Sequence, residues 1–136
     1  MIGYFDAEDG NPKVVLEIKG QHRSWKQIPA LFDTGHSGSL SLPIMDLIEV
    51  GAKFSNIGEA TYADGRSGVD YLFSIKVRFN GIEKKVEASM IQNPKVTMAI
   101  AGIKLFSPFI SFIDFKNGKL EFMKEGDFKK LLRKKK

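Results

Sequence analysis

Residues 71–91 constrain the possible folds of this chain more than any other stretch. They read YLFSIKVRFNGIEKKVEASMI. Apolar side chains occupy every second position over 71–79, which is the pattern of a strand with one buried face. Asn80 and Gly81 follow directly, and this pair strongly favours a tight two-residue turn. Apolar residues alternate again over 82–91, so the sequence predicts an antiparallel β-hairpin.

The rest of the chain also reads mostly as β. Short runs that alternate, or that are continuously apolar, are bounded by turn residues. Further strands are therefore expected at residues 14–18, 26–32, 96–101, 109–115 and 119–123. The pattern predicts an all-β fold, either a small closed barrel or a sandwich.

Two stretches have helical signals. Residues 43–51 begin with proline, which suits a first helical position, and end with glycine, which suits a C-terminal cap. Residues 127–136 follow Gly126, with Asp127 as the expected N-cap. We therefore expect one or two short helices beside the strands.

Length and composition limit the possible classes of protein. The chain has 136 residues, of which 43% are hydrophobic, so we expect one domain over 1–126 and a basic tail over 127–136, helical or frayed. No apolar run reaches membrane-spanning length, and we expect no secretion signal and no membrane partner. The absence of cysteine excludes disulfides, thiol nucleophiles and thiolate metal sites. These features favour a cytoplasmic protein.

The net charge of +5 is concentrated in the tail, where residues 129–136 read KKLLRKKK. A run of like charges at a terminus is usually solvated. The predicted strands show no exposed stripe of basic and aromatic residues that would stack on bases. We expect no specific nucleic-acid partner, although a nucleic-acid-associated β domain that uses the tail is a third, weaker hypothesis.

The stretch ALFDTGHSGSLSLP places a carboxylate, Asp33, directly after an apolar strand. Thr34 and Gly35 follow, and Asp-Thr-Gly is also common in ordinary turns, because such side chains bond local amides and glycine accepts positive φ. The two histidines, His22 and His36, lie in different predicted loops. Without cysteine they make a poor zinc site, so we expect no metal and no cofactor.

Four segments together resemble the retropepsin-like aspartic proteases, in particular the cellular single-domain members. In chain order the segments are LFDTGHSGSLSLP, TYADGRSGVDYLFSIKVRFNG, AIAGIKLF and FIDFKNGKLEF. The resemblance runs from about residue 13 to residue 123. It implies a small closed β-barrel of the acid-protease type that works as a homodimer on an extended peptide or protein substrate.

The resemblance also implies roles for individual residues. Asp33 would be the catalytic acid, and Thr34 would brace the site through a hydrogen bond to the opposite strand. Gly35 would allow the tight turn, and Ser37 would support the aspartate through its hydroxyl. Gly102 would lie beside the Asp33 loop, where only glycine permits close packing.

A flap and a cleft are implied as well. The flap would cover the cleft with a hairpin around residues 61–68, which could equally be an ordinary exposed hairpin. The implied flap residues are Tyr62, Ala63, Asp64 and Gly65. The implied cleft residues are His36, Ile100 and Ala101. His36 and Ala101 depart from the family pattern, as does Lys104, which stands where cellular members often have an acid.

The number of Asp-Thr-Gly motifs fixes the assembly that such a protease needs. An aspartic protease holds its water between two carboxylates, and this chain has one such motif. An active enzyme must therefore bring two copies of Asp33 together across a twofold axis. The sequence favours a homodimeric aspartic endopeptidase. A non-catalytic binding domain of the same fold is the alternative, because of the three departures.

Overall fold

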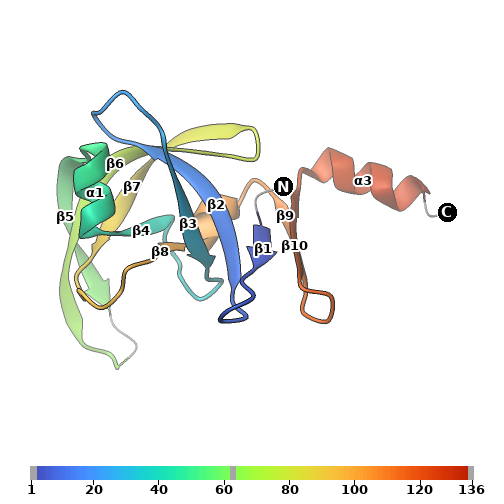
Figure 1. The fold of residues 1–136 in the computed structure, drawn as a ribbon, viewed down its shortest axis with the longest axis horizontal. Helices are drawn as coiled ribbons and strands as arrows, with labels where there is room; N and C mark the ends of the chain where they lie inside the picture. The colour runs from blue at the N-terminus through green and yellow to red at the C-terminus, as the bar shows by residue number, and fades with distance from the viewer. Residues whose placement is uncertain (1–2, 62–63, 135–136) are drawn as a thin grey trace.

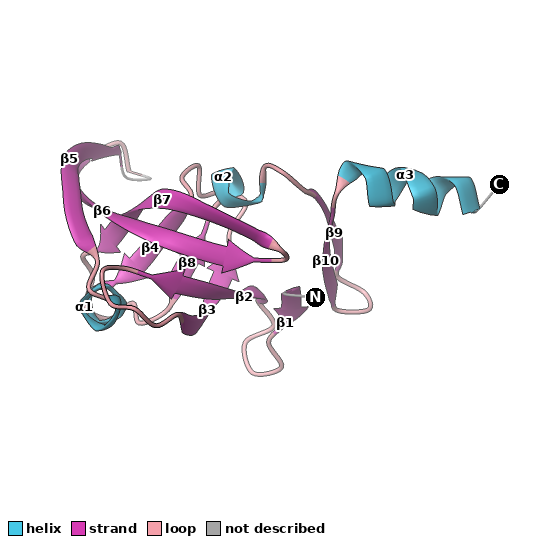
Figure 2. Cartoon of the chain, turned by 90° about the horizontal axis from the view of Figure 1, so that it is seen from above, coloured by secondary structure: helices cyan, strands magenta, loops and turns pink. Residues whose placement is uncertain are grey.

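The computed structural model describes residues 3–61 and 64–134 and is mostly β (Figures 1 and 2). The strands are β1 Gly3–Phe5, β2 Pro12–Lys19, β3 Lys26–Phe32, β4 Leu40–Pro43, β5 Lys53–Thr61, β6 Ser67–Phe79, β7 Ile82–Ile91, β8 Ala99–Ala101, β9 Ile110–Asp114 and β10 Lys119–Met123. The helices are α1 Ile44–Val50, α2 Ile103–Phe106 and α3 Glu125–Lys134.

Six strands close into a barrel. The large sheet has the order β1-β2-β3-β8-β4-β7-β6-β5, and β2 also pairs with β6. That last pairing closes β2, β3, β8, β4, β7 and β6 on themselves (Figure 1). β1 and β5 extend the sheet beyond the closure, and β9 and β10 form a separate two-stranded sheet. The prediction of an all-β fold is confirmed, and a closed barrel is formed instead of an open sandwich.

The β6–β7 hairpin is confirmed with its predicted turn. Phe79 pairs with Ile82, so that Asn80 and Gly81 alone form the loop. Both loop residues have positive φ, 46° and 76°. Positive φ at both central positions is the requirement of the turn type that matches the twist of a hairpin. The alternating side chains of β6 enter the core near this turn, where Val77 is fully buried.

Several element boundaries differ from the predictions. β5 was not expected, and almost all of its residues are exposed, so it has no apolar period. β8 covers only 99–101 of the expected 96–101, and Val96 is exposed. α3 begins at Glu125, before the predicted N-cap. α1 ends as predicted at Gly51, which has φ 65°.

Aromatic rings attach the last third of the chain to the barrel. The ring of Phe106 on α2 stacks on Phe122 of β10, with ring centroids 4.6 Å apart. Phe32 at the end of β3 makes edge contacts with both rings, at 5.0 and 5.3 Å. Edge-to-face aromatic pairs stabilise beyond the area that they bury. α2 and the β9–β10 hairpin are thus packed against the end of β3.

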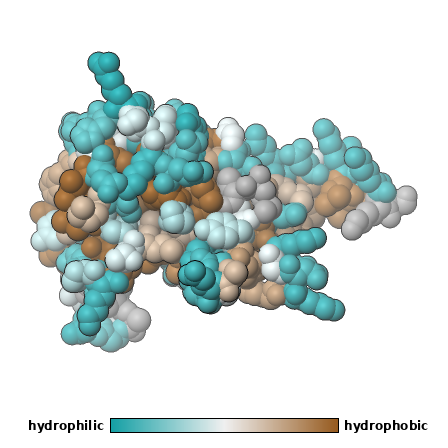
Figure 3. All heavy atoms as spheres, viewed as in Figure 1, coloured by the Kyte–Doolittle hydropathy of each residue, from teal (hydrophilic) through white to brown (hydrophobic). Residues whose placement is uncertain are grey.

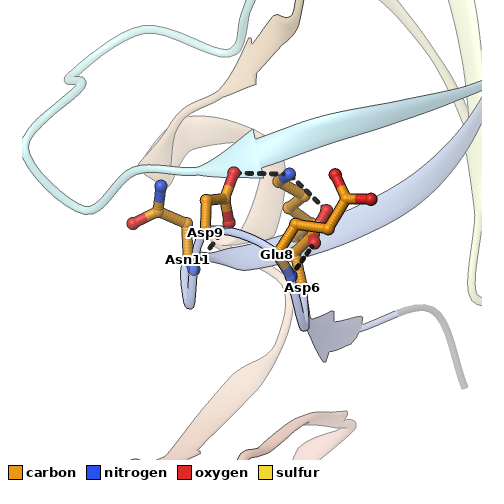
Figure 4. Close-up of polar contacts among 5 residues, drawn as sticks. Asp6, Glu8, Asp9 and Asn11 are labelled. Atoms are coloured by element: carbon orange, nitrogen blue, oxygen red, sulfur yellow. Dashed lines mark hydrogen bonds and ion pairs between the residues drawn. The ribbon is translucent and has the colours of Figure 1, made fainter.

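Asp6, Glu8, Asp9 and Asn11 lie in the turn between β1 and β2 (Figure 4), and this turn is built around a buried lysine. Lys13 is 3% exposed, and its Nζ lies 2.5 Å from Asp6 Oδ2 and 2.8 Å from Asp9 Oδ2. The Lys13 ammonium lowers the pKa of both carboxyls and is itself held charged, because they raise its pKa. The amides of Glu8 and Asn11 donate to the same two aspartates.

The C-terminal helix projects away from the barrel (Figure 1). The ring of Phe128 packs on Phe112 of β9, with centroids 5.5 Å apart, while Leu131 and Leu132 remain exposed. Figure 3 shows hydrophobic surface bordered by hydrophilic side chains in this part of the molecule. Within residues 3–61 and 64–134, every helix is too short or too polar to cross a bilayer.

Candidate functional site

Asp33 lies directly after β3, where β3 runs parallel to β8. Phe32 pairs with Ala101, and the Asp33 amide continues this ladder by donating to the Ala101 carbonyl at 3.0 Å. Phe32 is anchored in the core, whereas Asp33 is half-buried. The apolar strand thus fixes the backbone of the acid, and its carboxylate lies where the buried ladder meets the surface.

A tight turn surrounds the carboxylate. The Gly35 amide donates to Asp33 Oδ1 at 2.9 Å, and the His36 amide donates to the Asp33 carbonyl at 3.2 Å. A Cβ on residue 35 would lie 3.2 Å from Asp33 Oδ1, which is a tight contact. Glycine therefore lets the backbone at residue 35 lie close to the carboxylate. The other carboxylate oxygen, Oδ2, accepts no hydrogen bond from the described residues. An acid held in this way can accept a further hydrogen bond, for example from a water molecule.

The segment before α2 clasps the loop after Asp33. The amides of Gly102, Ile103 and Lys104 donate to the carbonyls of Ser39, His36 and Gly38, at 2.9, 3.0 and 3.2 Å. We call these three hydrogen bonds the loop clasp. They bring the second glycine motif against the first, although the two lie far apart in the sequence.

Gly102 is the closest point of this packing. A Cβ placed there would lie 2.2 Å from the Gly38 carbonyl oxygen and 2.6 Å from Cδ2 of His36. Both distances are below any that a real Cβ tolerates, and the first involves backbone. The position beside the Asp33 loop is therefore restricted to glycine.

A polar row near the loop was not predicted. His36 is half-buried, and its Nε2 lies 3.2 Å from Oγ of the buried Ser41. Ser41 pairs with Ile100 on β8 and with Ser89 on β7. The Ser89 hydroxyl donates to Asp70 Oδ2 at 2.8 Å. The sequence signal was present, since a serine interrupts an apolar run in both strands, but the pairing of β4 with β7 was needed to join them.

β5 and β6 form the hairpin that was expected to be a flap. Their pairing continues to Thr61 and Ser67, at the far end from the barrel (Figure 1). Gly65 has φ 84°, and Asp64 accepts hydrogen bonds from the amide and Nε of Arg66 at 3.0 and 2.6 Å. The two remaining flap positions of the prediction, Tyr62 and Ala63, lie outside the described residues.

Other predicted site residues are placed differently. Ala101 is fully buried in the core, so only its carbonyl contributes to the site, and it does not line a cleft as expected. Thr34 and Ser37 are exposed, and no hydrogen bond from either hydroxyl occurs within the described part of the chain. Their supporting roles remain predictions.

Side chains that could ligate a metal do not gather into a cluster within the described residues. The described residues contain no group of three or more His, Cys, Asp and Glu side chains that could hold one. The ring of His22 contacts a different part of the molecule, where Nδ1 lies 2.9 Å from the Glu49 carbonyl. The chemistry available at Asp33 is that of a carboxylate with a free acceptor oxygen.

Comparisons with known proteins bear on the fold. No protein-family model matches the chain, and no curated protein matches it. Among solved structures, the chain is similar to the EIAV protease in complex with the inhibitor HBY-793, with a TM-score of 0.54 and 12% sequence identity. The similarity covers 75% of this chain and 90% of that protease. The chain therefore has a fold of the retropepsin type, a closed β-barrel shared with a retroviral protease.

Proposed function

We propose that this protein is an aspartic endopeptidase and that Asp33 is its catalytic acid. The observation that carries the proposal is the placement of Asp33 at the end of β3, in a turn that leaves Oδ2 free. The barrel around it has the fold of a retroviral protease. An acid fixed by backbone on one side and open on the other suits the activation of water.

The reaction needs two such acids. Two carboxyl groups about 3 Å apart cannot both ionise, so they share one proton. The ionised carboxylate takes a proton from the attacking water, and the protonated carboxyl donates to the carbonyl oxygen of the peptide. Because each chain supplies one Asp33, the enzyme would be a homodimer with an isologous interface. The pair titrates as one unit, with two apparent pKa values.

The substrate would be an extended peptide. The β5–β6 hairpin offers main-chain groups to such a peptide and could exclude water from the reacting bond. Ile100 supplies apolar surface beside Ser41, so apolar side chains are expected near the cleaved bond. The Asp70–Ser89 contact lies on the other side of β4 from Ile100, because Ser89 of β7 is also a partner of Ser41, and it would meet a neighbouring part of the peptide.

The test compares cleavage of a peptide library near pH 4–6 by the wild-type protein and by Asp33→Asn. Cleavage should fall by about 10²–10⁴-fold in the variant, while its circular dichroism and sedimentation stay unchanged. Asp127→Asn on the projecting helix α3 is the matched control and should cleave normally. A strictly monomeric wild-type protein at micromolar concentration would exclude the proposal.

A non-catalytic peptide-binding domain of the same fold is the alternative. His36 favours it, because the ring lies against the Asp33 loop, where Gly38 and Gly102 leave little space. A wild-type dimer that binds peptides but cleaves none of them, at any pH at which it is folded, would establish this alternative.

A further inference from the structure

A cavity lined by lysines lies on the barrel wall, away from the Asp33 turn. It has a volume of about 150 Å³ and lies over β2, β6 and β7. Its lining includes Lys19, Gln21, Lys53, Ser74, Lys76 and Lys85. None of these residues belongs to the Asp33 turn or to the loop clasp.

Strand register creates this concentration of charge. Lys76 on β6 is the direct partner of Lys19 on β2 and of Lys85 on β7. On the same edge of β6 as β2, Lys53 of β5 is the partner of Ser74. Side chains on directly paired residues lie side by side on one face of a sheet, and like charges in such pairs are destabilising. We call Lys19, Lys76 and Lys85 the lysine row.

The described residues provide no ion pair for these four lysines. Glu83 and Glu87 are the acids on the same face of β7, and Glu87 is the cross-strand partner of Ser74. The Glu87 Oε1 accepts a hydrogen bond from Ser55 at 2.7 Å. The row next along the same strands is balanced, because Arg78 lies between Glu17 and Glu83 and bonds Glu17 at 2.9 and 3.1 Å. The fold thus neutralises one row and leaves its neighbour positive.

We propose that the lysine-lined cavity binds a compact phosphate-bearing anion, of the size of a phosphoryl or diphosphoryl group. An ammonium group acts as a strongly hydrated point charge with three donors, which suits phosphate oxygens. Four of them line one cavity, and Ser74 and Gln21 add neutral donors. A bound anion would replace the repulsion between neighbouring lysines with charge-assisted hydrogen bonds. This site is independent of peptide hydrolysis.

The experiment is a calorimetric titration of the full chain with inorganic diphosphate and with inorganic phosphate at low ionic strength. Diphosphate should bind more tightly than phosphate. Lys76→Gln should weaken diphosphate binding at least about tenfold, since one charge-assisted contact is worth more than an order of magnitude in affinity. Lys116→Gln, in the turn between β9 and β10, removes the same charge elsewhere and should leave binding unchanged.

Further arms separate a compact anion from a polymer. Amide chemical shifts on titration with diphosphate should move at Gln21, Lys53, Ser74 and Lys76. Equal weakening by Lys76→Gln and Lys116→Gln would overturn the proposal, as would the absence of diphosphate binding at millimolar concentration. So would a single-stranded oligonucleotide whose binding is weakened by Lys76→Gln and for which diphosphate does not compete.

Discussion

Two lysines of strand β2 have opposite surroundings. Lys13, near its start, is buried between Asp6 and Asp9. Lys19, at its end, is partnered across the sheet by Lys76, which is partnered in turn by Lys85. Lys13 has two carboxylates around its single positive charge. The cross-strand row that contains Lys19 has only positively charged side chains.

These surroundings show where the fold requires a positive charge to be compensated. A buried ammonium without partners costs several kcal/mol, so Lys13 is acceptable only with its two carboxylates. The lysines at the cavity reach solvent, where repulsion between them is screened and costs little. Charge at Lys13 therefore holds the structure together. The lysine row forms no ion pair within the described residues, and the Lys19 ammonium lies over the Trp25 ring, 5.8 Å from its centroid.

The largest loss of stability is expected from Lys13→Met, which removes the difference between the two lysines. The substitution leaves two carboxylates crowded in one turn without a counter-charge, and it should lower the urea midpoint at pH 7 more than any substitution in the lysine row. With Lys13 present, Asp6 and Asp9 have lowered pKa values, so their stabilisation is present above the usual aspartate pKa and is lost as the pH falls through the lower folded values.

The acid limb of stability therefore provides the measurement. In the wild type, unfolding below about pH 4 should be linked to the uptake of up to about two protons by these carboxylates. In Lys13→Met that dependence should flatten. An unchanged pH dependence, measured by urea denaturation from pH 7 to pH 3, would contradict the role assigned to Lys13.

A charge reversal in the lysine row should raise the free energy of unfolding, whereas Lys13→Met should lower it. Lys76→Glu places an acid between Lys19 and Lys85, so that the row alternates base, acid, base. The neighbouring row has the inverse order, with Arg78 between Glu17 and Glu83. The free energy of unfolding should rise by about 0.2–1 kcal/mol, because two unfavourable cross-strand pairs become favourable. Diphosphate binding should be lost in the same variant. Lys116→Glu is the matched control, and an equal gain there would mean that only net charge matters.

Ionic strength should have the smallest effect. Raising the salt concentration from about 0.02 M to about 0.5 M shortens the screening length, so repulsion in the lysine row weakens. The wild type should gain a few tenths of a kcal/mol relative to Lys76→Glu across this range. A difference between the two proteins that does not depend on salt would show that the row acts through packing.

Local patterns predicted the parts of the fold whose faces are buried. The β6–β7 hairpin follows from alternation and from Asn80-Gly81, and the end of α1 follows from Gly51. β5 escaped prediction because it leaves the barrel and has no buried face to impose a period. The register of β6 with β7 was readable from the turn, but the closure of β2 on β6, which creates the lysine row, joins segments far apart in the sequence.

The residues of the candidate site also fall into two groups, those that a local motif indicates and those whose contacts depend on how distant strands pair. The resemblance identified Asp33 and Gly102, whose geometry depends on backbone contacts that a motif preserves. It could not place Ala101, since one residue along β8 separates a buried side chain from a half-buried one. Ser41 and Asp70 were missed because their contacts depend on how β4, β7 and β6 align.

The loop clasp has a consequence for the order of events during protein synthesis. The carbonyls of His36, Gly38 and Ser39 accept hydrogen bonds from the amides of residues 102–104. These later residues leave the ribosome well after the loop that they bind. A nascent chain that stops before residue 99 lacks both β8 and the Ala101 carbonyl, which accepts the hydrogen bond from the Asp33 amide. Incomplete chains would then be inactive, and any hydrolysis would begin only after most of the polypeptide had emerged from the ribosome.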